Sequence, residues 1–479
     1  MTGEIPSFTA IELARRIRAR EFSAVAAYNA FVARVEALNP RLNALVRFDP
    51  AVGRAEARRA DERLAAGDEA SLLGVPFTAK DNLWVKGRPV SQGSTLFADF
   101  VAPEDAPAVA RLRAAGAVYL GTTNCSEFAC KGNTTNRLFG PTRNPWDLAR
   151  TPGGSSGGAA SAVAAGLGPI ALCTDGGGST RRPAAHVGVV GMKPSAGLVP
   201  HTGGFREPVF GNSVVGQMAR SVADVRLMLD AIAVPDLADP QGAPVPLWRR
   251  DVPNRVAGLR VAFSPRLGLG FPVDPDVAAS VRAAVNRLAG AGAIVEERDP
   301  PWLEGASEQA LMPLQLAGLA SLYGERFKAR AWDVDPDIGA QIEAGLRLSG
   351  AEVAAALHAR EALYRVLASF FGDFDLLVAP TTPVTAWPVE LLGPKEIEGK
   401  LVSPRGHAVF TPLFNHTYVP ACSVPCGLDG RGLPVGLQIV GPRFADAHVL
   451  ALAEVVERQT EPSFRAPRTP AASATRDRP

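Results

Sequence analysis

Apolar residues recur at helical spacing over the first seventy positions of the chain. Positions 11, 13, 14 and 17 are apolar and share one helical face, and Thr9 with Glu12 forms the pattern of a capping box before them. The same periodicity predicts helices over 24–38, closed by Asn39-Pro40, and over 50–66. We therefore expect the chain to begin with a helical segment.

From residue 73 onward, short apolar runs alternate with helical segments. The runs predict strands over 75–79, 117–121, 169–174, 259–264, 293–297, 374–379 and 436–441. The segments between them predict helices over 106–115, 157–165, from 180, over 277–288, through most of 303–371, and over 446–458. Strands that alternate with helices favour an α/β sheet covered on both faces.

Composition and charge narrow the class of protein. Hydrophobic residues make up 47% of the 479 positions, so the chain can bury a large core despite its 47 glycines and 41 prolines. Lysine and arginine (50) nearly balance aspartate and glutamate (48), without long runs of one sign, so we expect neither nucleic acid nor a membrane as partner. Residues 460–479 have the composition of a disordered tail.

The cysteines and the N-terminus give no sign of export or of a metal. The five cysteines show neither a Cys-x-x-Cys pair nor a Cys/His ligand spacing, so buried thiols and no metal are expected. The N-terminus lacks a basic region followed by an apolar one, and the longest apolar stretch, 159–173, is interrupted by glycine and proline. These features predict a cytoplasmic protein.

A first cluster of glycine and serine lies at 151–160. A flexible loop is one interpretation, but the glycines lead directly into a predicted helix, whose first N–H groups are free to bind. A phosphate-binding loop would need a lysine after the glycines, and none follows. Residues 153–157 match Gly-x-Ser-x-Gly, yet that motif needs a strand before it, and 139–147 reads as a loop with two prolines.

A second cluster joins a predicted strand to a predicted helix. Gly176, Gly177 and Gly178 can bring backbone N–H groups close to a substrate, and Ser179 follows them at the junction. A tight structural turn is the alternative. A nucleophilic serine needs a base. His186, two turns further on, would face away, whereas Lys80 ends an apolar strand, where partial desolvation would lower its pKa. A surface lysine is the alternative there.

Together these segments resemble the amidase signature family. The resemblance depends on 74–82 with Lys80, 153–158 with Ser155 and 175–181 with Ser179, which follow one another after 75 and 24 positions. Flanking segments agree at 121–124, 126–128, 140–146, 191–194, 379–383 and 432–441, so that the resemblance runs from about residue 8 to 458.

The resemblance implies a fold and a set of catalytic roles. It implies one large α/β catalytic domain over 1–459, with a central mixed, twisted β-sheet covered on both faces by α-helices. Ser179 would be the nucleophile, Ser155 the bridging serine after a cis peptide bond, and Lys80 the base. The oxyanion hole would consist of the N–H groups of Gly176, Gly177, Gly178 and Ser179.

Substrate contacts are expected from two further segments. Ala129 and Cys130 align with the substrate-facing loop of the family. The glycine-hinged loop 201–210 contains Phe205, Arg206 and Phe210, which could cover an apolar or aromatic substrate. An ordinary surface loop with a packed phenylalanine is the alternative. The family implies no cofactor, and we expect a monomer or homodimer with a small-molecule amide or carbamate as substrate.

The resulting hypothesis is an amidohydrolase that cleaves C–N bonds of non-peptide amides, possible substrates being aryl amides and carbamates (urethanes). The alternative is the glutaminase A-type subunit of a tRNA-dependent amidotransferase. Two departures bear on this choice: Gly176 stands where the family often has threonine, and residues 201–210 differ from what usually follows the nucleophile helix in those subunits. A non-catalytic binding protein on the same scaffold conflicts with the intact Lys80, Ser155 and Ser179.

Overall fold

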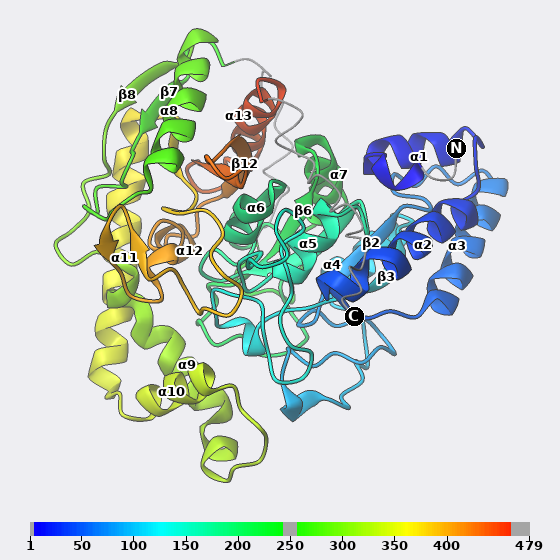
Figure 1. Cartoon of the computed structure of the whole chain (residues 1–479), viewed down its shortest axis with the longest axis horizontal. Coiled ribbons are helices and arrows are strands. Elements are labelled where there is room, and N and C mark those ends of the chain that lie inside the picture. The colour runs from blue at the N-terminus through cyan, green and yellow to red at the C-terminus, as the bar shows by residue number, and fades with distance from the viewer. Residues whose placement is uncertain (1–3, 243–255, 461–479) are drawn as a thin grey trace, which may run out of the picture.

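One mixed β-sheet runs through the chain (Figure 1). The computed structural model describes residues 4–242 and 256–460. Within them the sheet has 11 strands. In spatial order these are β1 (Leu45–Arg47), β3 (Val118–Thr123), β2 (Pro76–Lys80), β4 (Ile170–Asp175), β6 (Val214–Ala219), β5 (Val190–Lys193), β12 (Ala421–Leu428), β13 (Pro434–Val440), β9 (Leu376–Pro380), β7 (Arg260–Phe263) and β8 (Ile294–Glu297).

Two parallel groups are separated by antiparallel strands. β2 pairs in parallel with β3 and β4, and β7 pairs in parallel with β8 and β9. The pairs between them, from β4–β6 to β13–β9, are antiparallel. A short hairpin of β10 (Glu396–Ile397) and β11 (Lys400–Leu401) lies outside the sheet. Because β2 and β4 are parallel neighbours, their carboxyl ends meet at one edge, where the polar residues that follow them can converge.

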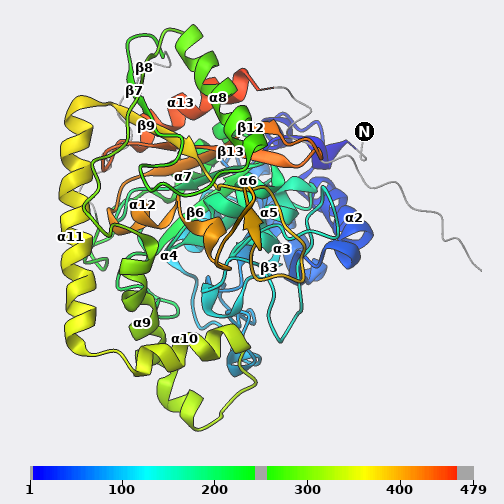
Figure 2. The same ribbon diagram turned by 60° about the vertical axis from the view of Figure 1, so that its left-hand side comes forward.

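Helices cover both faces of the sheet, as the sequence predicted. The described helices are α1 (Ala10–Arg18), α2 (Ala24–Leu42), α3 (Pro50–Ala65), α4 (Pro107–Ala114), α5 (Gly157–Ala164), α6 (Arg181–Val187), α7 (Val222–Ile232), α8 (Pro275–Gly290), α9 (Glu308–Lys328), α10 (Pro336–Leu346), α11 (Gly350–Asp373), α12 (Pro412–His416) and α13 (Asp446–Arg458). α9 and α10 lie together at one end of the molecule, and α11 runs along its side (Figure 2).

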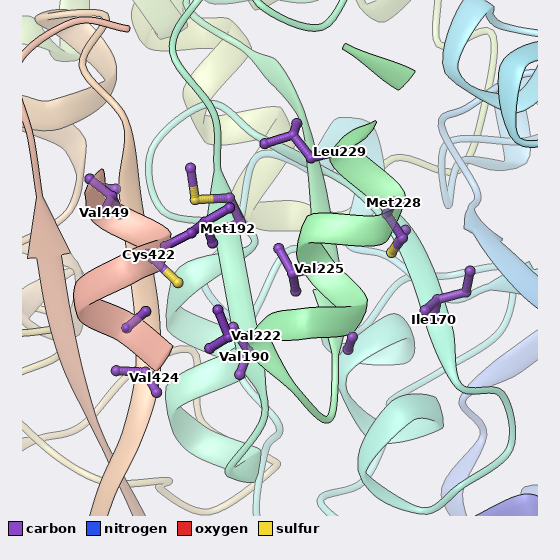
Figure 3. Close-up of a cluster of buried hydrophobic side chains, with 14 of the residues drawn as sticks. Ile170, Val190, Met192, Val222, Val225, Met228, Leu229, Cys422, Val424 and Val449 are labelled. Carbon is purple, nitrogen blue, oxygen red and sulfur yellow. The ribbon is translucent and has the colours of Figure 1, made fainter. Parts of the chain in front are cut away.

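Alternate residues of β5 show how the two faces are packed. Val190 and Met192 join the large apolar core with α7 and α13, where Val225 and Val449 also lie (Figure 3). Gly191, between them, faces α6 instead: a Cβ atom at Gly191 would lie 2.5 Å from the Cβ of Ala184. The glycine therefore lets α6 approach the sheet more closely than a larger residue would allow.

Most predicted elements are confirmed, and the differences have local causes. The capping box of Thr9 and Glu12 begins α1. The prediction that Asn39-Pro40 closes the second helix is wrong, since α2 continues to Leu42. Pro40 is tolerated because it lies in the last turn, where its missing N–H removes a single helical hydrogen bond. α2 ends instead at Asn43, which is left-handed with φ 50°.

Four strands of the sheet (β1, β5, β6 and β12), the β10–β11 hairpin and the helices α7 and α12 were not predicted from the sequence. β5 and β6 are short and contain glycine or polar residues, and α7 follows β6 directly. β12 contains Pro425, and its register shifts between Pro425 and Gly427, where a bulge accommodates the proline. No described helix is long and apolar enough to cross a membrane. Apart from Thr460, the predicted C-terminal tail lies outside the described residues.

We expect Leu437→Ala in the centre of β13 to destabilise the protein strongly. Leu437 is fully buried, so truncation should lower the free energy of unfolding by about 2–5 kcal/mol through lost burial and an unfilled cavity. Leu401→Ala is the matched control, because Leu401 is 88% exposed and should change stability by less than about 0.5 kcal/mol. Urea unfolding followed by circular dichroism measures both, and equal shifts for the two variants would contradict the assigned core.

Candidate active site

The structure brings the three predicted catalytic residues to one edge of the sheet. Lys80 is the last residue of β2, Ser155 lies in the loop before α5, and Ser179 lies between β4 and α6. The Nζ atom of Lys80 donates a hydrogen bond to Oγ of Ser155 at 2.7 Å. The Gly154–Ser155 peptide bond is cis, as the resemblance implies. The Ser155 and Ser179 loops are joined by the Ser156 N–H, which donates to the Ser179 carbonyl at 3.3 Å.

Burial separates the three residues by depth. Lys80 and Ser155 are fully buried, whereas Ser179 retains 6% exposure and lines a cavity. Burial lowers the pKa of Lys80 from its ordinary value, because a charged ammonium loses its hydration there. The sequence predicted partial desolvation of this lysine, and the structure shows that burial is complete. A buried amine below a solvent-accessible serine suits proton transfer outward through Ser155.

Two residues missed by the sequence reasoning complete the surroundings of Lys80. Its Nζ atom also donates to Oγ1 of Thr174 at 3.0 Å. Nδ2 of Asn82 donates to the same hydroxyl oxygen at 2.9 Å. Thr174 thereby accepts two hydrogen bonds and fixes one N–H of the amine away from Ser155. The sequence did carry a signal for both residues, since they lie at or just beyond the carboxyl ends of two neighbouring parallel strands.

The predicted oxyanion hole needs one correction. The Gly178 N–H donates to Oδ1 of Asp175 at 2.7 Å, so it is not available to a substrate. The turn folds back on the Asp175 carboxylate, which also accepts from the N–H groups of Thr180 and Arg181. Gly178 is needed for its backbone shape: its φ is +110°, and a Cβ atom there would lie 2.1 Å from Oγ1 of Thr411.

The other predicted donors remain available. The N–H groups of Gly176, Gly177 and Ser179 form no hydrogen bond with any described residue. Nδ2 of Asn212 donates to the Gly176 carbonyl at 3.1 Å, and Oγ1 of Thr411 donates to the Gly177 carbonyl at 2.9 Å. Each carbonyl contact fixes the peptide plane that carries the next N–H group. Gly176 and Gly177 line the cavity beside Ser179, so these amides can bind a developing oxyanion.

A buried ion pair holds this loop in place. Asp175 and Arg181 are both fully buried, with Nη2–Oδ1 at 3.0 Å and Nε–Oδ2 at 3.1 Å. Burial alone would raise the pKa of Asp175, but the Arg181 guanidinium and the Asn415 amide lower it far below its usual range. Arg181 also donates to Oε1 of Gln438 at 2.7 Å, which connects the nucleophile loop to β13.

The cavity above Ser179 has a volume of about 840 Å³. Of the predicted substrate contacts, Ala129, Cys130, Phe205 and Arg206 line it. Phe210 does not: its side chain is 44% exposed outside the cavity, and its carbonyl accepts from Nη1 of Arg360 at 3.1 Å. The chain turns at this point, with left-handed φ values of 53° at Phe210 and 75° at Gly211, and this turn carries the ring away. The assignment of Phe210 to the substrate site is therefore corrected.

One wall of the cavity is a rigid loop at 127–130. Phe128 and Ala129 are both left-handed, with φ of 50° and 61°, a costly backbone for residues other than glycine. Phe128 stacks on Tyr323 of α9 at 3.9 Å between ring centroids, which holds the loop under α9. Burial raises the pKa of the Cys130 thiol to about 12, so this cavity residue is no thiolate nucleophile at neutral pH.

An aromatic cluster that includes Phe205 of the loop 201–210 continues this wall, because Phe97 contacts both Phe128 and Phe205. The Phe205 ring lies 4.9 Å from Phe97, 5.1 Å from Phe100 and 5.6 Å from Trp84, measured between ring centroids. Leu311, Met312 and Leu316 of α9 add apolar surface. Phe205 thus anchors the loop and presents an aromatic surface to the cavity.

The other side chains that could take part in catalysis or bind a metal, His186 and the cysteines, are buried in the core. His186 is buried edge-on against Trp387 at 5.3 Å, and burial lowers its pKa to about 3, so it is a neutral residue of the core. All five cysteines are free and buried, which confirms the prediction of buried thiols. Among the residues described, no group of three or more His, Cys, Asp or Glu side chains could hold a metal ion.

Known proteins resemble the whole chain. A family model described as Amidase matches residues 26–450. An acylamidase of Rhodococcus erythropolis is 38% identical over 93% of this chain and 94% of its own. The A subunit of the glutamyl-tRNA(Gln) amidotransferase of Moorella thermoacetica is also 38% identical, over 97% and 99%. The crystal structure of a bacterial aryl acylamidase of the amidase signature family superposes with a TM-score of 0.88 at 28% identity, over 96% and 97%.

We expect Asp175→Asn to lower both the free energy of unfolding and the turnover rate. The substitution keeps the shape but leaves the Arg181 charge buried without a counter-ion, which should lower the free energy of unfolding by about 3–5 kcal/mol. Asp68→Asn removes a partly exposed partner of Arg63 and should leave the free energy of unfolding close to that of the wild type. Urea unfolding compares the two variants, and an Asp175→Asn protein as stable as the control would contradict the role given to this pair.

Proposed function

Because the chain belongs to the amidase signature family of hydrolases acting on carbon–nitrogen bonds, we propose that it cleaves non-peptide amides with apolar or aromatic groups, including aryl amides and carbamates. The observation that carries this proposal is the buried hydrogen bond between Lys80 and Ser155. It lies beneath Ser179, and Ser179 lines a largely apolar cavity. The residues supply a nucleophile, a proton relay and free backbone amides in one place.

Acylation begins with the neutral amine of Lys80. Thr174 accepts one N–H of the amine. In the neutral amine the 2.7 Å contact with Ser155 runs in the opposite direction, and the Nζ lone pair accepts the proton of Ser155. Ser155 in turn takes the proton of Ser179, whose Oγ attacks the substrate carbonyl. Within the described chain no hydrogen bond joins the two serine hydroxyls, so their approach belongs to the substrate complex, where catalytic contacts tighten. The free N–H groups at 176, 177 and 179 receive the negative oxygen.

The return of the proton completes the cycle. Collapse of the tetrahedral intermediate breaks the C–N bond, and the proton on Lys80 passes through Ser155 to the leaving nitrogen, which departs as a neutral amine. Water then attacks the acyl-enzyme, gives its proton to the same relay and releases the acid with regeneration of Ser179. For a carbamate the same steps leave a carbonate ester on Ser179, which water converts to a monoester of carbonic acid that loses carbon dioxide.

The cavity surface supports the choice of substrate. Phe128, Phe205 and the α9 side chains Leu311, Met312 and Leu316 line the cavity beside polar and charged groups. The apolar part of the lining favours an aromatic or aliphatic group on the substrate. The resemblance to an aryl acylamidase structure points the same way.

A glutaminase subunit of a tRNA-dependent amidotransferase is the second candidate. The observation in its favour is that the Moorella thermoacetica amidotransferase chain matches this one as closely in identity as the acylamidase does. The two functions differ in their partner requirement. Turnover of anilides by the isolated chain supports the amidase, whereas glutamine turnover that appears only with partner subunits supports the transferase.

We expect Ser179→Ala to abolish turnover without loss of the fold. Removal of the nucleophile should lower kcat by roughly 10³–10⁶-fold on para-nitroanilides and phenyl carbamates. Ser156→Ala is the matched control in the Ser155 loop, because its hydroxyl contacts the Thr174 carbonyl at 3.4 Å and the Cys173 side chain, not Lys80 or Ser179. Ser156→Ala should keep most of its turnover. Acyl transfer that survives in Ser179→Ala would refute the nucleophile assignment.

The pH dependence should report the buried lysine. Burial lowers the pKa of Lys80, so the neutral base becomes available below the pH at which an exposed lysine loses its proton. We expect kcat/KM for a neutral anilide to rise from acidic pH and to level off well below pH ~10, the range of an ordinary lysine. Lys80→Met should be inactive at every pH. A rate that rises only near pH ~10 would contradict a desolvated base.

A further inference from the structure

The cavity contains a buried cation that the proposed mechanism does not use. Arg182 follows Ser179 by three residues on the first turn of α6, lines the cavity and is only 5% exposed. Its Nη2 atom makes one long hydrogen bond, to the Gly154 carbonyl at 3.5 Å. Its Nε and Nη1 atoms are buried and have no hydrogen-bond partner among the described residues. Burial lowers the pKa of Arg182 to about 10, which still leaves the guanidinium charged at neutral pH.

The other charges around the cavity are compensated. Arg405 forms an ion pair with Glu308 from α9. Lys131 forms one with Asp335. The Glu207 carboxylate accepts hydrogen bonds from the N–H groups of Val209 and Gly211. Arg206 is exposed to solvent. Among the described residues that line the cavity, Arg182 is therefore the buried cation without a carboxylate at ion-pair distance.

A buried guanidinium destabilises the protein unless a ligand accepts its hydrogen bonds. A buried guanidinium without acceptors loses its hydration and gains little in return. Hydrogen bonds between charged partners are the stronger ones, and a planar carboxylate matches arginine better than a neutral carbonyl does. An anionic oxygen group of the substrate would complete the site, whereas the free protein leaves it unsatisfied.

The position of Arg182 restricts where the anionic group can lie on the substrate. Its Nε atom lies 3.1 Å from the point that a Cβ atom would take at Gly178, so the guanidinium is beside the nucleophile loop. His407 lines the cavity near it, and burial, together with the charges of Arg182 and Arg405, holds the pKa of that imidazole well below its usual value. His407 is therefore a neutral neighbour. Because Arg405 is paired with Glu308, the unpaired positive charge at this end of the cavity is that of Arg182.

We propose that Arg182 binds a carboxylate that the amide substrate carries a few atoms from its scissile carbonyl. This inference rests on the proposed function and narrows it to half-amides and related acids: one end of the molecule is anionic, and the other lies against the aromatic wall formed by Phe128 and Phe205. The carboxylate can belong to the acyl part or to the amine part, and the two sources are distinguished by experiment.

Three chromogenic substrates test this assignment. Butyryl para-nitroanilide is neutral, succinyl para-nitroanilide places a carboxylate on the acyl chain, and the butyryl anilide with a ring carboxylate places it on the amine. The wild-type protein should favour one of the two acids over the neutral anilide by roughly 10- to 100-fold in kcat/KM, the range expected of a charge-assisted hydrogen bond. A preference for neither acid would overturn the inference.

Variants assign the preference to Arg182. In Arg182→Gln the ratio of acidic to neutral kcat/KM should fall to about one, and in Arg182→Lys, which keeps the charge without the planar fork, it should take an intermediate value. Arg282→Gln is the matched control: this arginine lies on α8, is half-exposed and pairs with Glu297 outside the cavity. The control should keep the wild-type ratio. A wild-type ratio in Arg182→Gln would overturn the assignment.

A binding measurement separates this inference from the proposed function. Calorimetry of succinyl para-nitroanilide with Ser179→Ala, and with Ser179→Ala combined with Arg182→Gln, needs no turnover. Binding should weaken by roughly 10- to 100-fold in the double variant. Absence of turnover for all three anilides would contradict the proposed function alone. Equal binding of the acid by the two proteins would contradict the carboxylate site, whatever the turnover.

Discussion

The pairing of Asp175 with Arg181 is the interaction on which the rest of the site depends. Both groups are fully buried, and the carboxylate binds three backbone N–H groups of the nucleophile turn as well as the guanidinium. The negative charge of Asp175 raises the pKa of Lys80, but burial of the amine lowers that pKa by more and keeps the amine available as a base. The ion pair thus shapes the oxyanion loop.

The sheet supplies the geometry that this chemistry needs. β2 and β4 are parallel neighbours, so Lys80 and the turn after Asp175 reach the same edge without long connections. The α6 helix, which follows the nucleophile, packs closely on the other strands because Gly191 and Gly436 leave room for Ala184 and Ala185. Substitution of either glycine would push the helix outward, and the position of Ser179 depends on that helix. Small residues far from the cavity therefore determine where the nucleophile lies.

Sequence reasoning found the parts of the site that motifs encode and missed those that depend on packing. Lys80, Ser155 and Ser179 were identified because each stands in a segment with its own pattern, and the α/β architecture followed from alternating periodicity. Asn82 lies in the segment around Lys80 and Thr174 near the end of a predicted strand, but their shared role at the amine appears only when β2 and β4 lie side by side. The error at Gly178 has a related cause, since the direction of a single N–H group depends on how the turn folds around Asp175. Phe210 was wrongly assigned to the substrate site because a phenylalanine gives no indication of a left-handed turn, and this turn directs its ring out of the cavity.

Specificity has to come from residues outside the catalytic motifs. The chain is equally similar to an acylamidase and to a component of an amidotransferase, so the shared relay and oxyanion amides do not distinguish the two activities. The cavity walls come from segments far apart in the sequence: the loop 127–130, the loop 201–210 and α9, which the stack of Phe128 on Tyr323 holds together. Cys130 of the loop 127–130 influences the pKa of Lys80, so the loop 201–210 and α9 are the walls that can change while the burial of the base remains. Arg182 is the exception, because it lies on the nucleophile helix itself, and its charge therefore selects substrates at the point where the chemistry occurs.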